Sequence, residues 1–282
     1  MTRLHTGLPL IIRTRRPVIC RDEENFLILH SLRITRGSTA ILAGVSLPAQ
    51  SVLPLYLPMA RLVHIHREGT NILILLFMVL VAINVPVWLF MPPYVLPAIC
   101  SGVSLLTYCF VFNFFRCPRR TYKGPRHGYV ASSVDGKVVA IEKVNEPEYL
   151  HGPAVMLSVF MSPLNVHANW FPVDGTVEYI RHHQGRFFSA YLPKASTENE
   201  RSTIGIVTDT GQRITVRQIA GAMARRIVTY ARKGCRADID DHLGFIKFGS
   251  RVDIYLPPDT EILVKIGDRT VGGVTPVARF RS

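Results

Sequence analysis

The sequence predicts an α+β, β-rich protein in which a two-helix transmembrane hairpin precedes an antiparallel β domain with one main helix. No Asp, Glu, Lys, Arg or His occurs between Thr70 and Phe115, although 19% of the 282 residues are charged. From Gly124 onward, short runs rich in Val and Ile alternate with Gly, Pro and Asp-Gly, a pattern typical of strands and turns. Residues 219–232 are rich in Ala, Met, Arg and Ile up to Gly234, which favours a helix.

The first 58 residues have no sustained helical or alternating periodicity, so we expect an unstructured leader there. Met59 lies just before the basic segment 59–69 that precedes the uncharged run, and we hypothesise that translation starts at Met59. A targeting leader is the alternative, but Asp22-Glu23-Glu24 and the absence of a signal-peptide apolar core argue against it. N-terminal sequencing of the natural protein would refute the hypothesis by finding a residue upstream of Met59.

The uncharged run 70–115 is long enough for two membrane spans, since one helix needs about 20 apolar residues to cross a bilayer. Met91-Pro92-Pro93 lies near its middle, and proline ends a helix because it lacks an N–H and clashes with the preceding turn. We therefore predict spans at about 71–91 and 94–115. A buried hairpin of a soluble protein is the alternative, but such helices usually keep a charged face.

Basic residues flank both ends of this hairpin, whereas its turn carries no charge. By the positive-inside rule, we expect both ends and residues 116–282 on the cytoplasmic side of the cell (inner) membrane. The flanking basic residues are His64, His66 and Arg67 before the first span, and Arg116, Arg119, Arg120, Lys123 and Arg126 after the second.

Residues 116–282 are predicted to form the β domain. Val134-Asp135-Gly136 and Val173-Asp174-Gly175 are predicted turns, because Gly adopts positive φ freely and Asp bonds to the local backbone. The predicted strands are Lys137–Val144, Ala154–Met161, Gly175–Ile180, Ser202–Thr208, Arg213–Ile219, Ile254–Leu256, Glu261–Val264 and Thr275–Phe280.

Several classes of chemistry lack their motifs. No CxxC or HExxH occurs, and the adjacent His182-His183 would point to opposite faces of a strand, so no metal is predicted. No P-loop or GxGxxG precedes a helix, which argues against nucleotide chemistry. The formal net charge of +13 indicates an anionic partner. Because aromatic-interleaved basic stripes are missing, anionic membrane lipid fits this charge better than nucleic acid.

Two separated phrases resemble phosphatidylserine decarboxylase proenzymes, especially their short subclass. They are Phe160-Met161-Ser162-Pro163-Leu164-Asn165-Val166-His167-Ala168-Asn169 and Gly244-Phe245-Ile246-Lys247-Phe248-Gly249-Ser250-Arg251-Val252-Asp253. The segments 194–201 and 218–227 add further matching phrases, and the resemblance extends from about Val63 to Phe280. It implies a carboxy-lyase that converts phosphatidylserine to phosphatidylethanolamine and carbon dioxide.

The resemblance also implies that the chain cleaves itself between Gly249 and Ser250. The Ser250 hydroxyl would attack the carbonyl of Gly249, and elimination and hydrolysis would then leave a pyruvoyl group on residue 250. The products would be a β chain ending at Gly249 and an α chain of residues 250–282. The pyruvoyl cofactor would form a Schiff base with the amine of phosphatidylserine and act as the electron sink.

Serine is a weak nucleophile and needs a base. By resemblance, His167 is that candidate and Asp135 is its acidic partner, in the manner of a Ser-His-Asp triad. Trp170 stands where the longer bacterial subclass has a second histidine, so His167 could serve self-cleavage, decarboxylation or both. The list of candidate substrate-binding residues is Asn199, Arg201 and Lys194.

Two alternatives remain, a non-enzymatic protein and an enzyme of the same mechanism with another substrate. Residues 173–177 and 264–273 resemble the half-repeats of biotinyl and lipoyl carriers, which would suit a membrane-anchored adaptor without enzymatic activity. No modifiable lysine phrase of that kind occurs here. A pyruvoyl decarboxylase of another amine would share the mechanism, but the predicted hairpin favours a lipid substrate. A homo-oligomer is left open.

Overall fold

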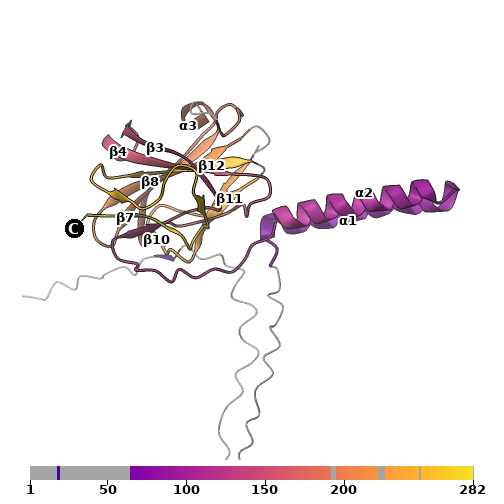
Figure 1. Cartoon of the computed structure of the whole chain (residues 1–282). Coiled ribbons are helices and arrows are strands. Elements are labelled where there is room, and N and C mark those ends of the chain that lie inside the picture. The colour runs from indigo at the N-terminus through magenta and orange to yellow at the C-terminus, as the bar shows by residue number, and fades with distance from the viewer. Residues whose placement is uncertain (1–17, 20–63, 192–194, 222–225, 248, 282) are drawn as a thin grey trace, which may run out of the picture. The chain divides into compact units, whose positions relative to one another are not determined.

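The computed structural model describes residues 18–19, 64–191, 195–221, 226–247 and 249–281 (Figure 1). They fall into two compact units. The hairpin unit comprises 64–120 and 163–168, and the β unit comprises the other described residues. Of the predicted leader, only Val18–Ile19 are described, and these form strand β1, which pairs with the β unit. The hypothesised start at Met59 lies outside the described residues.

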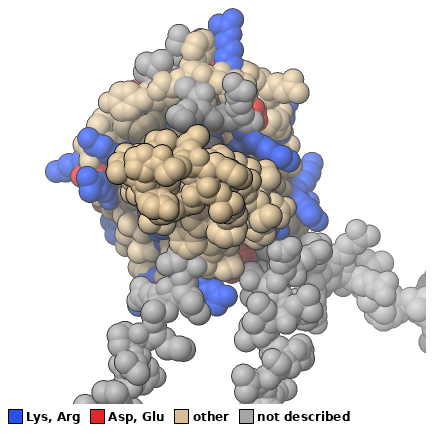
Figure 2. All heavy atoms as spheres, turned by 90° about the vertical axis from the view of Figure 1, so that its right-hand side faces the viewer, with Lys and Arg blue, Asp and Glu red and all other residues tan. Residues whose placement is uncertain are grey.

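Two long helices form most of the hairpin unit, α1 (Arg67–Phe90) and α2 (Val95–Phe114), and they run side by side (Figure 1). Both are long and apolar enough to cross a membrane, and only 6% of the most apolar window of each is buried. Figure 2, which views the hairpin end-on, shows its near surface without Lys, Arg, Asp or Glu, and the charged residues of α1, Arg67 and Glu68, lie in its first turn. This uncharged, unburied surface suits contact with lipid.

Polar side chains join the two helices within this apolar surface. The Asn84 amide donates to the Ser104 hydroxyl at 2.8 Å, and the Ser101 hydroxyl donates to Asn84 Oδ1 at 3.0 Å. The Trp88 indole donates to Ser101 at 2.9 Å. Such interhelical hydrogen bonds contribute about 0.6–2 kcal/mol in a membrane, so they help to hold the hairpin closed.

The base of the hairpin is fastened by backbone contacts. His66 N donates to the carbonyl of Phe115 at 2.9 Å, and Cys117 N donates to the carbonyl of His64 at 2.7 Å. Gly69 packs so closely on the Phe115 ring that a Cβ on it would lie 2.3 Å from that ring. The entry to α1 and the exit from α2 are thus held together.

A nine-stranded sheet dominates the β unit, and its neighbours pair antiparallel except β1 with β10. In spatial order after β1 its strands are β10 (Cys235–Ala237), β6 (Gly175–His183), β7 (Arg201–Thr208), β8 (Arg213–Ala220), β12 (Ser250–Leu256), β4 (Gly152–Met161), β3 (Gly136–Glu146) and β14 (Arg269–Thr270). Two three-stranded sheets complete the fold: β5 (Ala168–Trp170), β11 (His242–Ile246) and β9 (Ile227–Thr229), and β13 (Glu261–Ile262), β15 (Pro276–Arg279) and β2 (Tyr129–Ala131).

The two faces of the nine-stranded sheet differ in chemistry. On β12, Val252, Ile254 and Leu256 point into the main hydrophobic core, and we call this the core face. Arg251 and Tyr255 alternate with them and are equally buried, on what we call the polar face.

The predicted fold class and all eight predicted strands are confirmed, with ends shifted by up to four residues. The helix predicted at about 219–232 is wrong for the described residues there. Ile219 and Ala220 end strand β8, and residues 227–229 form strand β9. Helix propensity is weak, and the burial of Ile219 in the sheet overrides it. In the described part of the β unit, the helix is instead the short α3 (Ala195–Glu198).

Candidate active site

Ser250 is the first residue of β12, which lies between β8 and β4. Its register partners are Ala220 and Met161. The side chain is fully buried, and its hydroxyl donates to Met161 Sδ at 3.2 Å. A thioether is a weak acceptor, so this contact leaves the hydroxyl oxygen available for reaction.

Two glycines surround the peptide bond before Ser250. Gly249 has φ +63°, in the left-handed region that favours glycine. The carbonyl oxygen of Gly249 lies against Gly221, where a Cβ would be only 2.1 Å from it. The position of this carbonyl therefore depends on a glycine at 249 for its backbone angle and on a glycine at 221 for space.

His167 lies in the hairpin unit and is fully buried. Its Nδ1 is 2.9 Å from the carbonyl oxygen of Asn165, and because a carbonyl can only accept, Nδ1 carries the proton. In the neutral ring, Nε2 is then the nitrogen that can accept a proton. The ring lies 4.0 Å from the Phe114 ring between centroids. Arg116 holds the same loop by donating to the carbonyl of Leu164 at 2.9 Å.

Asp135 lies in the predicted turn before β3, and its Oδ1 accepts a hydrogen bond from Gly272 N at 2.9 Å. Trp170 is buried, and its ring lies edge-on to His242 with 5.1 Å between centroids. Asp135 and Ser250 belong to the β unit, and His167 belongs to the hairpin unit.

Asn199 is fully buried, and its side chain binds only backbone groups in the described residues. Its amide nitrogen donates to the carbonyls of Phe188 and Ala220, both at 2.7 Å, and its Oδ1 accepts from Phe188 N at 3.0 Å. Asn199 thus fastens the 186–199 segment to the end of β8. Arg201 donates to the carbonyl of Thr197 at 2.6 Å, and Lys194 lies outside the described residues.

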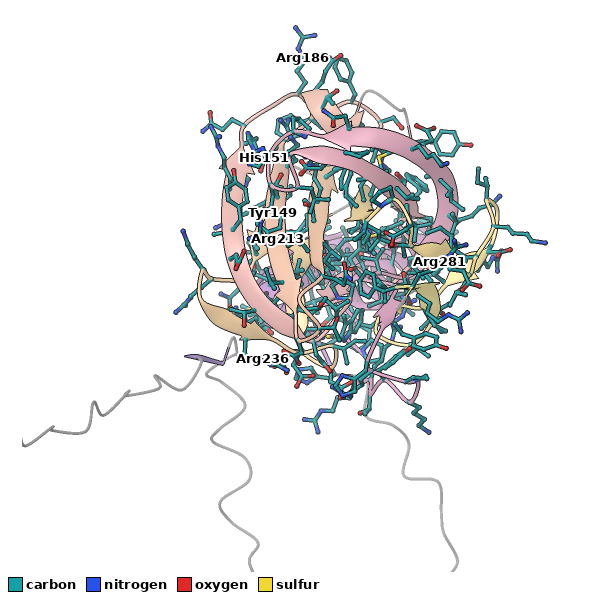
Figure 3. All side chains as sticks on the ribbon, turned by 90° about the vertical axis from the view of Figure 1, so that its left-hand side faces the viewer. Tyr149, His151, Arg186, Arg213, Arg236 and Arg281 are labelled. Carbon is teal, nitrogen blue, oxygen red and sulfur yellow. The ribbon has the colours of Figure 1, made fainter. Side chains whose placement is uncertain are left out.

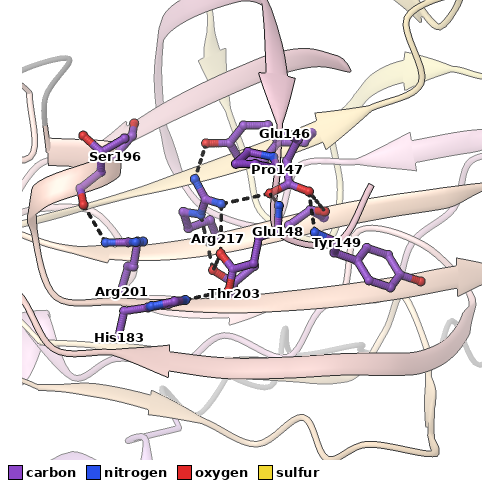
Figure 4. Close-up of polar contacts among 12 residues, drawn as sticks. Glu146, Pro147, Glu148, Tyr149, His183, Ser196, Arg201, Thr203 and Arg217 are labelled. Atoms are coloured by element: carbon purple, nitrogen blue, oxygen red, sulfur yellow. Dashed lines mark hydrogen bonds and ion pairs between the residues drawn. The ribbon is translucent and has the colours of Figure 1, made fainter. Parts of the chain in front are cut away.

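Sequence reasoning missed a buried charge network on the polar face (Figure 4). Arg217 forms ion pairs with Glu146 and Glu148, each at 3.2 Å, and His183 lies 2.5 Å from Glu148. Burial alone would raise the pKa of Glu148, but hydrogen bonds from His183 and Thr203 and the nearby charge of Arg217 lower it overall. These residues are far apart in sequence, and only the polar positions within strand β8 could have hinted at them.

A second buried pair lies directly after Ser250. Arg251 Nε is 2.8 Å from Asp253 Oδ1, and Ser196 donates to Asp253 Oδ2 at 2.7 Å. Strand β12 is thereby joined to α3 on the polar face, next to the point of predicted cleavage.

Comparison with known proteins identifies the same family as the sequence phrases at residues 160–169 and 244–253. A family model described as phosphatidylserine decarboxylase matches residues 108–278. The phosphatidylserine decarboxylase proenzyme of Bacteroides fragilis is 52% identical over 222 residues, which cover 78% of this chain and 96% of that protein. The chain belongs to the phosphatidylserine decarboxylase family. The proenzymes of Phocaeicola vulgatus and Cytophaga hutchinsonii are 49% and 42% identical over 219 residues each, covering 78% and 77% of this chain and 96% and 99% of those proteins.

Membership in the phosphatidylserine decarboxylase family confirms the resemblance seen in the sequence. The matched region contains Asp135, His167, Gly249 and Ser250. Because these relatives of the phosphatidylserine decarboxylase family are proenzymes by name, the family implies processing of a precursor.

Proposed function

We propose that this chain decarboxylates phosphatidylserine to phosphatidylethanolamine and carbon dioxide, after cleaving itself between Gly249 and Ser250. The observation that carries the proposal is the Gly249-Ser250 bond at the head of β12, within a chain of the phosphatidylserine decarboxylase family. Family membership favours this enzyme over the adaptor alternative.

The surroundings of Ser250 support self-cleavage. The Ser250 hydroxyl attacks the carbonyl carbon of Gly249, and the peptide C–N bond breaks to give an ester. Elimination then releases the carboxylate of Gly249, and hydrolysis with loss of ammonia leaves the pyruvoyl group. The weak contact of the hydroxyl with Met161 and the fixed carbonyl of Gly249 both fit the first step.

The pyruvoyl group, once formed, supplies an electron sink for the loss of carbon dioxide from an amine-bearing substrate. The residues of the chain supply the rest. His167 accepts and returns a proton at Nε2, and Asp135 offers a carboxylate fixed by Gly272. Of the three predicted substrate-binding residues, Asn199 binds backbone groups, and Arg201 lies on the polar face with Arg251, opposite to the Ser250 side chain. Neither is given a role in this reaction.

The hairpin unit supports a membrane location. Its two apolar helices support membrane association, and the basic residues at both ends favour, in this proposal, the inner membrane with the β unit on the cytoplasmic side. An enzyme held at the lipid surface meets a lipid headgroup without extracting the lipid from the bilayer.

Intact mass under denaturing conditions, together with lipid turnover, tests this proposal. The wild-type chain should give two polypeptides, the smaller beginning at residue 250 with the mass of a pyruvoyl end. It should convert phosphatidylserine in mixed micelles but leave free serine unchanged. Ser250→Ala should give one full-length chain without activity. A Ser250→Ala chain that still breaks at this bond would contradict the assignment.

A further inference from the structure

A cavity of about 540 Å³ opens on the polar face of the nine-stranded sheet. Side chains of β3, β4, β7, β8 and β12 line it, together with Ser196 and Thr197. Small-molecule sites commonly measure about 300–1,000 Å³, so the cavity is large enough for a ligand. It lies on the face of β12 opposite to the Ser250 side chain, because Arg251 and Tyr255 line it and alternate with Ser250.

The lining of the cavity is apolar at one end and cationic at the other. Ala140 and Met156 belong to β3 and β4, whereas Arg201, Arg217 and Arg251 belong to β7, β8 and β12. The strand order β7-β8-β12-β4-β3 therefore separates the arginines from the apolar side chains.

Arg201 is the cation in this lining whose charge the described residues leave unmatched. Arg217 pairs with Glu146 and Glu148, and Arg251 pairs with Asp253. Arg201 forms no ion pair within the described chain. It donates from Nη1 to two backbone carbonyls, and its Nε is buried without a hydrogen-bond partner. Figure 4 shows it next to the Ser196–Thr197 segment.

Electrostatics favours an anion beside Arg201. Burial, first, and then the neighbouring guanidinium of Arg217 lower the pKa of Arg201, and the nearby carboxylate of Glu148 offsets this only in part, so the charge of Arg201 is incompletely compensated in the free protein. The two glutamates of the lining do not fill this role. Glu148 already accepts from Arg217, His183 and Thr203, and Glu142 is exposed to solvent. Buried hydrogen-bond donors in proteins nearly always have an acceptor, so the Nε of Arg201 favours a ligand that supplies one.

We propose that this cavity binds an anionic amphiphile, with its phosphate or carboxylate on Arg201 and its apolar chain along Ala140 and Met156. A phosphate on a guanidinium makes charge-assisted hydrogen bonds, and the apolar end removes a short acyl chain from water. The source of such a ligand is lipid. This site does not depend on the proposed reaction, because it needs neither a free Ser250 hydroxyl nor a pyruvoyl group.

Calorimetric titration of the full-length Ser250→Ala chain in a non-ionic detergent tests the site, since this chain cannot mature. Dihexanoyl phosphatidic acid should bind saturably, and Arg201→Gln in the same background should weaken binding at least tenfold. Arg213→Gln is the matched control and should change binding less than twofold. Arg213 lies on the same face of β8 as Arg217 but outside the cavity, over the Tyr149 ring at 5.9 Å (Figure 3).

Two further ligands distinguish the contribution of the anionic headgroup from that of the acyl chains. Inorganic phosphate, which has no chain, and dihexanoyl phosphatidylcholine, which has no net charge, should each bind at least tenfold more weakly. Ala140→Trp narrows the apolar end and should weaken the binding of phosphatidic acid, which keeps the test open should Arg201→Gln fail to fold. Equal binding of phosphatidic acid by the Arg201→Gln and parent chains would overturn the proposal. Phosphate binding as tightly as phosphatidic acid would reject an amphiphile in favour of a free anion.

Discussion

Gly221 and Gly249 meet at the bond that the proposed self-cleavage breaks. A serine attacks a carbonyl efficiently only when the reacting atoms are held in a near-attack geometry. Gly249 contributes a backbone angle of φ +63°, and Gly221 contributes the space that its missing side chain leaves for the Gly249 oxygen. We expect the two glycines to restrict the position of the Gly249 carbonyl. The Ser250 hydroxyl, which has only a weak contact with Met161, should be less restricted.

Gly221→Ala should slow self-cleavage sharply, because the new methyl group would have to displace the Gly249 carbonyl. A displacement of about 1 Å can cost about 100-fold in rate, which gives the expected size of the effect. The fraction of full-length chain after fixed maturation times measures it. Gly152→Ala is the control, because Gly152, like Gly221, is not among the glycines with a positive φ, and a Cβ on it would lie no closer than 3.9 Å to the Leu150 carbonyl oxygen. Normal cleavage in Gly221→Ala would show that Gly221 does not position the carbonyl.

His167→Ala should lower the rate of self-cleavage, of decarboxylation or of both by about 100-fold or more, as expected for loss of a general acid or base. Fresh precursor measures the first rate, and mature enzyme measures the second. His182→Ala is the control, since the His182 side chain is 48% exposed and lies beside Glu200. Normal rates of both steps in His167→Ala would remove His167 from the site.

At the scale of elements, the end of α2 and the 163–168 loop form one local structure. Phe114 lies against the His167 ring, and Arg116 bridges the helix end to the loop by binding Asn113 Oδ1 at 2.6 Å and the Leu164 carbonyl at 2.9 Å. His167, the candidate general base, is therefore held next to the end of α2 within the hairpin unit.

Arg116→Gln should release the loop and lower the rates that depend on His167 by about tenfold, because the glutamine reaches less far and carries no charge. Its effect should also be larger in self-cleavage assays at higher temperature, where a loosened loop samples more conformations. Arg119→Gln removes a charge from the same flank at an exposed position and should leave both rates within twofold. Equal rates in the two variants would show that the contact of Arg116 with the 163–168 loop does not affect the function of His167.

At the scale of the whole molecule, the network around Glu148 ties strands that are distant in sequence. Glu146, at the end of β3, accepts from the backbone N–H groups of Glu148, Tyr149 and Leu150 at 2.7–3.0 Å. Glu148 reaches His183 on β6, and Arg217 on β8 binds both glutamates. Removing one member leaves the buried charge of the others less well compensated, so each such loss should destabilise the β unit.

Glu148→Gln should lower the free energy of unfolding by about 1–3 kcal/mol at pH 7. Because the folded pKa of Glu148 lies below its ordinary value of 4.5, the stability from its charge is present above that value. It is lost as pH falls through the folded pKa, so the variant and wild type should converge there. Urea unfolding between pH 2 and 7 measures the difference. Glu178→Gln, at a side chain that is 44% exposed, should change stability by less than about 0.5 kcal/mol. A difference in unfolding free energy that does not change with pH would contradict a stabilising role for the Glu148 charge.

The sequence predicted those features that are local along the chain. The hairpin follows from an uninterrupted apolar run divided by two prolines, and the Gly249-Ser250 bond lies within one short phrase. The Glu146–Glu148–Arg217 network, the cavity beside Arg201 and the contact of Gly221 with Gly249 join residues that only strand pairing brings together. The helix expected at 219–232 failed for the same reason, because Ile219 is buried between neighbouring strands and packing outweighs propensity.

Strand β12 begins at Ser250 and is hydrogen-bonded on both sides, to β8 and to β4. A nick before its first residue creates a new chain end without exposing a sheet edge. Strands β13, β14 and β15, which also follow the nick, pair within sheets that include β2 and β3 from before it. The two polypeptides of the matured protein should therefore remain interlocked without a covalent link, unfold in one transition and separate only in denaturant.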